Sequence, residues 1–189
     1  MDAGSRIQEA SLKKLSDIKN ALSGIQYLVF SIERFQEMPI RKAKISDVRD
    51  IQKLIERSAK KGEMLPRSLS ELYDNLRDHY VYVENGLEGI IGTCAMHICW
   101  EDLAEVRSLV VQEEYQHQGI GSKLIEACLS EAVSLGLYRI FALTYRPDFF
   151  KNHGFKVVDK AALPHKIWAD CIKCVKFPEC DEIAVLLEV

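Results

Sequence analysis

Residues 116–121 have the types and spacing to bind an anion. They read Gln-His-Gln-Gly-Ile-Gly, after a Val-rich run and before an apolar stretch with helical spacing. Gly119 and Gly121 lack a Cβ, so a bulky anion can come close to the backbone. The N–H groups and the positive dipole end of the following helix then favour phosphate oxygens. Two glycines at this spacing also suit a tight strand-to-helix turn, so both a phosphate site and a purely structural turn fit the motif.

A second group of chemistry-bearing side chains lies near the C-terminus, at His165, Cys171, Cys174 and Cys180. Cys-x-x-Cys is half of many zinc sites, and a third Cys with a His could complete tetrahedral coordination. The spacing after Cys174 is not that of a second Cys-x-x-Cys, and a free Cys also packs as a small hydrophobe. We therefore expect packed thiols and no metal, with zinc at these four residues as the alternative.

Helix-like and strand-like patterns alternate from Pro39 onward. The predicted elements must position the loop at residues 116–121 and the Cys and His residues near the C-terminus. Helices are expected at residues 46–62, with Ser46 as N-cap and Gly62 as the stop, and at residues 68–76, 119–135 and 147–153. Strands are expected in IRKAKI, on both sides of Asn85-Gly86 in YVYVENGLEGIIGTCAMHICW, and in AEVRSLVV, YRIFALT, FKVV and EIAVLLEV. These elements predict an α+β (α/β) fold, in which helices flank a mixed, mostly antiparallel central sheet.

Residues 1–37 have a different pattern from the rest of the chain. Apolar residues such as Ile7, Leu15, Leu22 and Val29 belong to a series at three- and four-residue steps, which predicts an extra N-terminal amphipathic helix. This segment either packs or mediates a homodimer. Alternatively, translation begins at Met38. We therefore divide the chain into a helical extension at residues 1–37 and a domain at residues 38–189.

Length and charge narrow the class of protein. A chain of 189 residues suits one domain with a full core, and its net charge of −3 argues against nucleic acid or an anionic membrane as partner. The N-terminus has no secretory signal pattern, and no run reaches the ~18 apolar residues of a spanning helix. Six cysteines without an export signal indicate reduced thiols. These features together predict a soluble cytoplasmic protein.

Several stretches resemble known enzymes. The loop at residues 116–121 is similar to the Q/R-x-x-G-x-G/A loop of the GNAT acetyltransferase superfamily, and FFKNHGF is similar to that family's short helix with a Gly-Phe ending. GEMLPRSLSELYDNL, AEVRSLVV, FALTYRPDFFKNHGF and LPHKIWADCIKC together resemble the short, stand-alone N-acetylglutamate synthase group. The resemblance implies the GNAT acyl-CoA N-acyltransferase fold. It also implies transfer of acetyl from acetyl-CoA to the α-amine of L-glutamate, the first step of arginine biosynthesis.

The resemblance also implies where acetyl-CoA binds. The loop would hold its pyrophosphate, pantetheine would pair with the open edge of a splayed strand, and a backbone N–H near a bulge would bind the thioester oxygen. The residues expected to contact the cosubstrate are Leu109, Val110, Val111, Gln116, His117, Gln118, Gly119, Ile120, Gly121 and Phe150.

Catalytic roles follow from the same resemblance. Glu105 is the expected proton acceptor for the amine, with an ordinary surface Glu as the alternative. Many GNAT enzymes have Tyr where this chain has Phe150, so the usual general acid is absent. Thr144 or Tyr145 could donate the proton instead, or they could simply cap the strand end. A thiol of pKa about 8.5 leaves without full proton donation, so activity does not require that acid.

A glutamate acceptor brings two carboxylates, which suit bidentate pairing with Arg. The expected acceptor-binding residues are Arg67, Arg107, Ser108 and Lys166. Glu105 and Arg107 project to one strand face, where they could meet an amine and a carboxylate of one ligand or pair with each other.

Two further functions remain open from the sequence. One is acetylation of another small amine or of a protein amine, because one fold serves many acceptors. The other is a CoA-binding regulatory module without turnover, an interpretation that Phe150 supports.

Overall fold

The computed structural model describes residues 39–84, 89–164, 172, 174 and 176–189. The predicted N-terminal helix, the Asn85-Gly86 turn, and His165, Lys166 and Cys171 lie outside the described residues. Four α-helices are described, α2 (Val48–Lys60), α3 (Leu69–Asp74), α4 (Ile120–Ser134) and α5 (Pro147–Lys151). The described strands are β1 (Ile40–Lys42), β2 (His79–Tyr82), β3 (Gly92–Ile98), β4 (Leu103–Val111), β5 (Arg139–Thr144), β6 (Lys156–Val157) and β7 (Ile183–Glu188).

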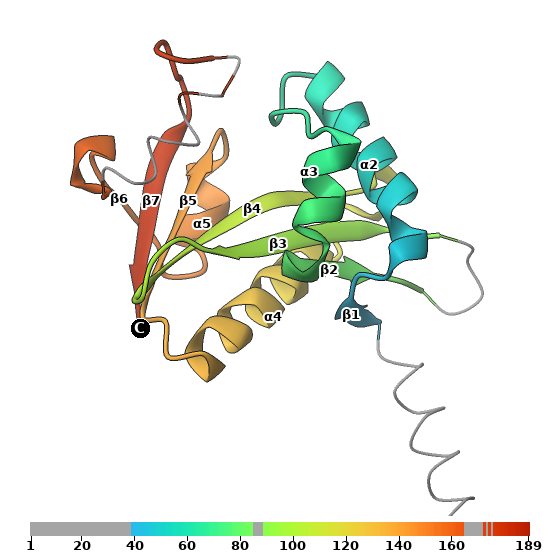
Figure 1. Cartoon of the computed structure of the whole chain (residues 1–189), viewed down its shortest axis with the longest axis horizontal. Helices are drawn as coiled ribbons and strands as arrows, with labels where there is room; N and C mark the ends of the chain where they lie inside the picture. The colour runs from blue at the N-terminus through green and yellow to red at the C-terminus, as the bar shows by residue number, and fades with distance from the viewer. Residues whose placement is uncertain (1–38, 85–88, 165–171, 173, 175) are drawn as a thin grey trace, which may run out of the picture. The chain divides into compact units, whose positions relative to one another are not determined.

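The strands form one sheet in the order β1-β2-β3-β4-β5-β7-β6 (Figure 1). β4 and β5 run parallel, and the other described neighbours are antiparallel. The mixed, mostly antiparallel sheet predicted from the sequence is therefore confirmed. Among the described residues, no helix is long and apolar enough to cross a membrane.

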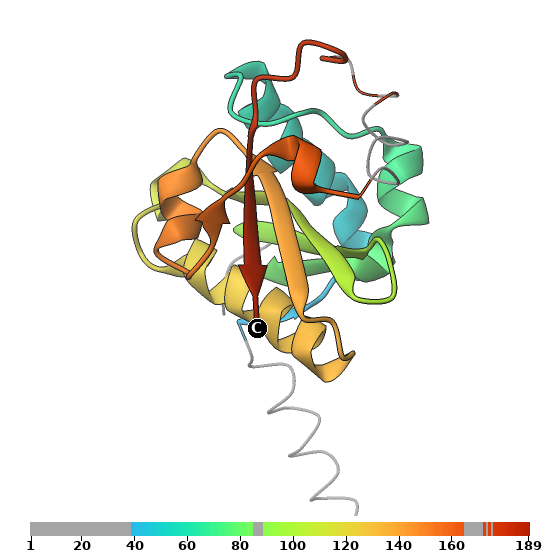
Figure 2. The same cartoon turned by 90° about the vertical axis from the view of Figure 1, so that its left-hand side faces the viewer.

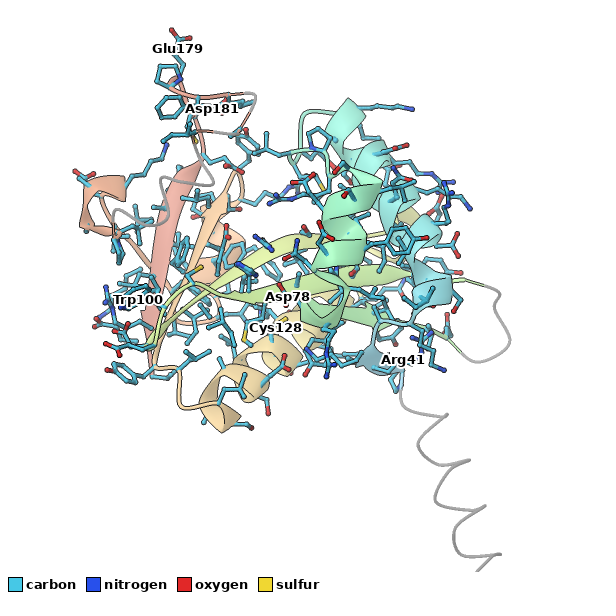
Figure 3. All side chains as sticks on the ribbon, viewed as in Figure 1. Arg41, Asp78, Trp100, Cys128, Glu179 and Asp181 are labelled. Atoms are coloured by element: carbon cyan, nitrogen blue, oxygen red, sulfur yellow. The ribbon has the colours of Figure 1, made fainter. Side chains whose placement is uncertain are left out.

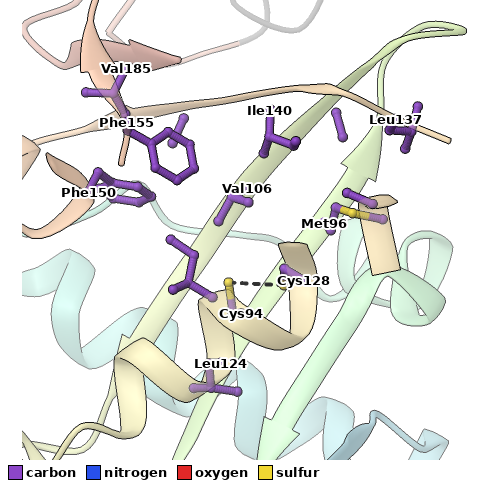
Figure 4. Close-up of a cluster of buried hydrophobic side chains, with 14 of the residues drawn as sticks. Cys94, Met96, Val106, Leu124, Cys128, Leu137, Ile140, Phe150, Phe155 and Val185 are labelled. Atoms are coloured by element: carbon purple, nitrogen blue, oxygen red, sulfur yellow. Dashed lines mark hydrogen bonds between the residues drawn. The ribbon is translucent and has the colours of Figure 1, made fainter. Parts of the chain in front are cut away.

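Helix α4 covers one face of the sheet and forms the main core. Leu124, Ile125 and Cys128 of α4 are fully buried. They pack against a set of buried strand residues that includes Cys94, Met96, Val106, Ile140 and Val185 (Figure 4). Each aliphatic side chain buried in this way contributes about 1.5–3 kcal/mol. This packing fixes the N-terminus of α4 close to the end of β4.

The opposite face is covered at two separate places. Val48, Ile51 and Ile55 of α2 pack with Leu72 of α3 and with Val81 of β2. Farther along the sheet, a smaller cluster consists of Leu103, Phe141, Leu163 and Ala184. Figure 2 shows α5 and α3 on opposite sides of β5 and β7. The middle of this face, over β4, therefore lies between two covered regions.

Two helix ends agree with the sequence, α3 and α5 end two residues before their predicted ends, and one predicted cap is wrong. Gly62 ends α2 with a left-handed φ of 75°, and Ser68 caps α3 by accepting the Glu71 N–H. Ser46, however, is not the N-cap of α2, because it lies inside a 3-10 turn at Ile45–Asp47. Asp47 is the N-cap residue of α2 instead, and its side chain closes the capping box of that 3-10 turn. Its Oδ2 accepts the Lys44 N–H at 2.7 Å and pairs with Arg41 Nη1 at 2.7 Å, so the prediction at Ser46 was wrong.

Candidate active site

A cavity of about 1040 Å³ lies along β4. Its volume is at the upper end of the usual range for ligand pockets. It is lined by the loop before α3, by β4, by the first turn of α4 and by the end of β5. It extends to α5 and to the segment that leads into β7. The predicted site residues that line it are Arg67, Glu105, Arg107, Ser108, Leu109, Val110, Val111, Gln116, His117, Gly119, Gly121, Thr144, Tyr145, Phe150, Cys174 and Cys180.

A β-bulge interrupts β4 at the centre of the cavity. Thr93 pairs with Val110 and Ala95 pairs with Arg107, so β4 has one residue more than β3 between these two pairs. Ser108 supplies the distortion with a φ of 54°, an uncommon conformation for a residue with a Cβ. The bulge twists the strand and changes the direction of the following N–H groups. Leu109 and Val110 follow it directly and line the cavity.

β4 separates from β5 immediately before this bulge. The parallel pairing consists of Leu103, Ala104 and Glu105 opposite Arg139, Ile140 and Phe141. Beyond Glu105, the described part of β4 has no paired residue on β5, and the two strands diverge in Figure 1. The open edge of β4 (residues 106–111) therefore faces the cavity.

The Gly-containing loop joins this edge to α4. His117 and Gly119 have left-handed φ values of 60° and 77°. Gln116 Nε2 donates to the Val111 carbonyl at 3.1 Å, which ties the loop to the end of β4. The N–H groups of the first turn of α4 have no intrahelical acceptor, so this end of the helix favours an anion.

Gly119 and Gly121 differ in their steric surroundings. The positive φ at position 119 favours glycine, because any residue with a side chain is strained in that conformation. A Cβ on Gly121 would meet Phe149 Cζ at 3.5 Å, which is ordinary van der Waals contact. The protein's own packing therefore does not require glycine at position 121, and close approach by a ligand is the remaining physical reason for it.

A charged network connects the floor of the cavity to the strands beside it. Arg107 Nη1 lies 3.6 Å from Glu105 Oε2, and Arg107 Nη2 lies 3.5 Å from Asp78 Oδ2. Asp78 Oδ2 also contacts His97 Nδ1 at 2.7 Å. The side chains of Arg107 and Glu105 are only 13% and 15% exposed, so water screens their attraction weakly. Glu105 and Arg107 thus pair with each other, and their contact with one ligand stays a prediction.

Arg67 has a looser environment than Arg107. Its described ion pair is with Glu71 at 3.4 Å, between side chains that are 30% and 50% exposed. Ion pairs between side chains as open to solvent as these contribute only about 0–1 kcal/mol. The Arg67 guanidinium can therefore exchange Glu71 for a ligand carboxylate at little cost.

The sequence of residues 45–155 matches the acetyltransferase (GNAT) family, and these residues span the open strand, the loop and α4. The chain belongs to this family. It is therefore a GNAT acetyltransferase with acetyl-CoA as its cosubstrate.

Curated relatives agree with this membership. An uncharacterized N-acetyltransferase of Chlorobaculum tepidum is 38% identical over 147 residues, which cover 78% of this chain and 94% of that protein. The amino-acid acetyltransferase of Mycobacterium tuberculosis is 34% identical over 121 residues, 64% of this chain and 69% of the relative. The amino-acid acetyltransferase of Shewanella oneidensis is 35% identical over 145 residues, and the matched part is only 31% of that longer protein.

Solved structures share the fold. A Mycobacterium tuberculosis protein in complex with CoA aligns with a TM-score of 0.69 at 26% identity, over 79% of this chain and 98% of that one. The N-acetylglutamate synthase of Neisseria gonorrhoeae, complexed with coenzyme A and N-acetyl-glutamate, aligns with a TM-score of 0.71 at 23% identity. That match covers 79% of this chain and 34% of the synthase, and it supports the GNAT fold alone.

The two candidate proton donors of this GNAT domain have other partners in the structure. Tyr145 Oη donates to Asp181 Oδ1 at 2.9 Å. Thr144 Oγ1 accepts the Arg146 N–H at 2.9 Å, the strand-end capping considered from the sequence, but a hydroxyl that accepts can still donate. Phe150 is 5% exposed and packs edge-on against Phe149 and Phe155, so it serves the core.

Two predicted cosubstrate residues do not line the cavity of the GNAT domain. Ile120 is buried in the core beneath the loop, and Gln118 Nε2 donates to the Glu114 carbonyl at 3.2 Å. Cys174 and Cys180 do line it, as free thiols. Within the described residues, no group of three or more His, Cys, Asp and Glu side chains could hold a metal ion. His165, Lys166 and Cys171 lie outside these residues, so the zinc alternative at the complete four-residue set stays a prediction.

Glu182, Lys160 and His79 are among the polar residues of this cavity that sequence reasoning missed. Burial, followed by the negative charge of Glu105, raises the pKa of the Glu182 carboxyl above its usual value. Lys160 Nζ donates to the Cys180 carbonyl at 2.7 Å. The alternation of EIAVLLEV contained a signal for Glu182, because it stands two residues before the buried Ala184 and so shares its face.

Proposed function

We propose that the chain moves the acetyl group of acetyl-CoA to the α-amine of L-glutamate. One observation supports this assignment above the others. A single cavity joins the first turn of α4, which favours an anion, to Arg67 and Glu105 along the open edge of β4. The relatives named amino-acid acetyltransferase support an amino acid as acceptor.

Acetyl-CoA supplies the acetyl group as a thioester, and three parts of the chain would hold it. Gly119, Gly121 and the first turn of α4 receive the pyrophosphate. The open edge of β4 offers its N–H and C=O groups to the pantetheine amides, as an unpaired strand edge does for a peptide. The N–H group of Leu109 or Val110, redirected by the bulge, donates to the thioester oxygen as negative charge develops there.

Arg67 and Glu105 would position the acceptor. An amino-acid amine is mostly protonated at neutral pH, so Glu105 accepts its proton directly or through water. Arg67 binds an acceptor carboxylate, because its own pair with Glu71 joins side chains that are 30% and 50% exposed and is therefore weak. Arg107 is already shared by two carboxylates, and we assign it to holding Glu105 in place.

Thr144 would assist the departure of the thiol. Its hydroxyl hydrogen can still be donated, whereas the Tyr145 hydroxyl donates to Asp181. A thiol of pKa about 8.5 is a tolerable leaving group, so this assistance makes a modest contribution to the rate.

The experiment that tests the proposal is release of free thiol from acetyl-CoA. The purified full chain is assayed against the twenty amino acids and against a peptide with a free N-terminus. We expect turnover with glutamate, at a higher kcat/KM than with the peptide. Faster turnover of the peptide would show a protein-amine acceptor instead. Acetyl-CoA binding without turnover of any acceptor would indicate a regulatory module.

A further inference from the structure

Glu105 on β4 and Glu182, the residue directly before β7, line one cavity. Glu105 is two residues after Leu103 on β4, and Glu182 is two residues before Ala184 at the start of β7. Leu103 and Ala184 belong to one buried cluster. β4 and β7 are the two neighbours of β5 in the sheet. Both carboxylates therefore project into the cavity from opposite sides of β5.

Glu182 is a half-buried carboxylate with little compensation from the protein. Among the described residues it forms no salt bridge, and its hydrogen-bond contact is with the Cys180 thiol at 3.9 Å. The negative charge of Glu105 disfavours its ionised form, and Lys160 offsets this only in part. The other titratable side chains near it are Asp181, Lys176 and Tyr145.

Two like charges that face one cavity make a good site for a cation. Each carboxylate destabilises the other when both are ionised, and a bound cation removes this repulsion. The acceptor in the proposed reaction is a cation of the right kind, because its α-ammonium carries one charge and three N–H donors. One donor can point to each carboxylate and leave the third for water.

We propose that Glu182 is a specificity-determining residue that binds the acceptor's ammonium group together with Glu105. This inference rests on the proposed function, and it defines the acceptor as a molecule with a primary ammonium beside an anionic group. Arg67 takes the anionic end of the acceptor on the α3 side of the cavity. The two glutamates take the cationic end, so the acceptor lies in a single orientation.

The same arrangement favours release of the product. Acetylation converts the ammonium into a neutral amide, while the carboxylates of the acceptor remain. The product therefore loses its attraction to Glu105 and Glu182, and its negative charges are repelled by them. The site distinguishes substrate from product by charge.

The test compares Glu182→Gln, which keeps shape and removes charge, with Glu182→Asp, which keeps the charge. Glu179→Gln is the matched control, because Glu179 is exposed on the same segment, is not a cavity residue, and points away from the domain (Figure 3). Binding of glutamate and of N-acetylglutamate to the full chain is measured by calorimetry with CoA present. Thiol release with glutamate is measured on the same proteins.

In the Gln variant we expect glutamate affinity to fall about 10- to 100-fold, the effect of losing one charge-assisted hydrogen bond. N-acetylglutamate affinity should stay unchanged or rise, because this ligand has no ammonium. The Asp variant should recover part of the loss, and the Glu179 variant should match wild type. A merely structural role for Glu182 would change both affinities alike.

Equal losses for both ligands, or no loss for glutamate, would overturn the ammonium site. If the Gln variant also still turns over glutamate, the proposed function stands without the ammonium site. If wild type binds glutamate with this dependence on Glu182 but does not acetylate it, the ammonium site stands and the proposed function fails. Absence of glutamate binding to wild type would overturn both.

Discussion

Arg107 Nη1 lies 3.6 Å from Glu105 Oε2, two residues earlier on β4, and its other terminal nitrogen reaches Asp78 Oδ2 at 3.5 Å. One guanidinium thus bridges two carboxylates, Glu105 on β4 and Asp78 in the turn directly before β2. A planar group with five N–H donors can hold both of them in fixed orientations. We infer that Arg107 supports Glu105. The side chains of this pair are 13% and 15% exposed, whereas those of the Arg67–Glu71 pair are 30% and 50% exposed.

Replacement of Arg107 should therefore lower kcat. In Arg107→Ala, Glu105 loses the group that orients it, so proton acceptance from the amine becomes less efficient, by about 10- to 100-fold in kcat. The KM for glutamate should change less than kcat. Steady-state kinetics of thiol release separates the two parameters. A raised KM at unchanged kcat would instead identify Arg107 as a direct contact of an acceptor carboxylate.

Replacement of Arg67 should have the opposite kinetic signature. Arg67→Ala removes a charge-assisted contact to the acceptor of about 1.5–3 kcal/mol, so the KM for glutamate should rise about 10- to 100-fold at nearly constant kcat. Arg57→Ala is the matched control, because Arg57 is exposed on α2 and is not a cavity residue. An acceptor KM equal to that of the control would remove Arg67 from the binding site.

Substitutions at the two loop glycines should have different effects, one on stability and the other on acetyl-CoA binding. Gly119→Ala places a side chain at a φ of 77°, which costs about 1–2 kcal/mol of stability. Gly121→Ala lies in a helix with only ordinary contacts to Phe149, so stability should be retained or slightly raised. Its acetyl-CoA Kd should nevertheless increase, because the added methyl group occupies the approach of the pyrophosphate. Thermal unfolding and calorimetric titration check these outcomes, and an unchanged Kd would make Gly121 only part of a turn.

The free energy of unfolding should decrease below neutral pH because of the titration of His79. This side chain is 3% exposed, and burial lowers its pKa from 6.5 to about 4. Below pH 6.5 His79 is protonated in the unfolded chain, whereas in the folded chain it stays neutral down to about pH 4. The free energy of unfolding therefore decreases as pH falls through this window, by up to about 3 kcal/mol.

Urea unfolding at pH 7.5 and at pH 4.5 measures this effect. Wild type should lose about 2–3 kcal/mol more than His79→Gln between the two values, because Gln does not titrate. Other carboxylates that titrate in the same window are common to both proteins and cancel in the comparison. Equal losses in both proteins would show that His79 is protonated in the folded state.

The sequence by itself determined the elements and the position of the Gly-containing loop before α4. Hydrophobic periodicity located each described helix and strand, and Gly62 and Ser68 marked helix ends, because these signals depend on neighbours within a few residues. The Gly-x-Gly spacing before α4 indicated an anion site for the same local reason. The one cap that failed, Ser46, failed because Asp47 pairs with Arg41 on another element.

The tertiary structure alone decided the geometry of the cavity. The bulge at Ser108 and the separation of β4 from β5 depend on how three strands pair, which no local pattern specifies. Asp78 reaches Arg107 only because β2 and β4 both neighbour β3. Glu182 is 77 residues from Glu105 along the chain, and only the sheet order brings both carboxylates into one cavity. Pairing between distant strands is set by the packing of the whole core, so these contacts emerge only when the chain is folded.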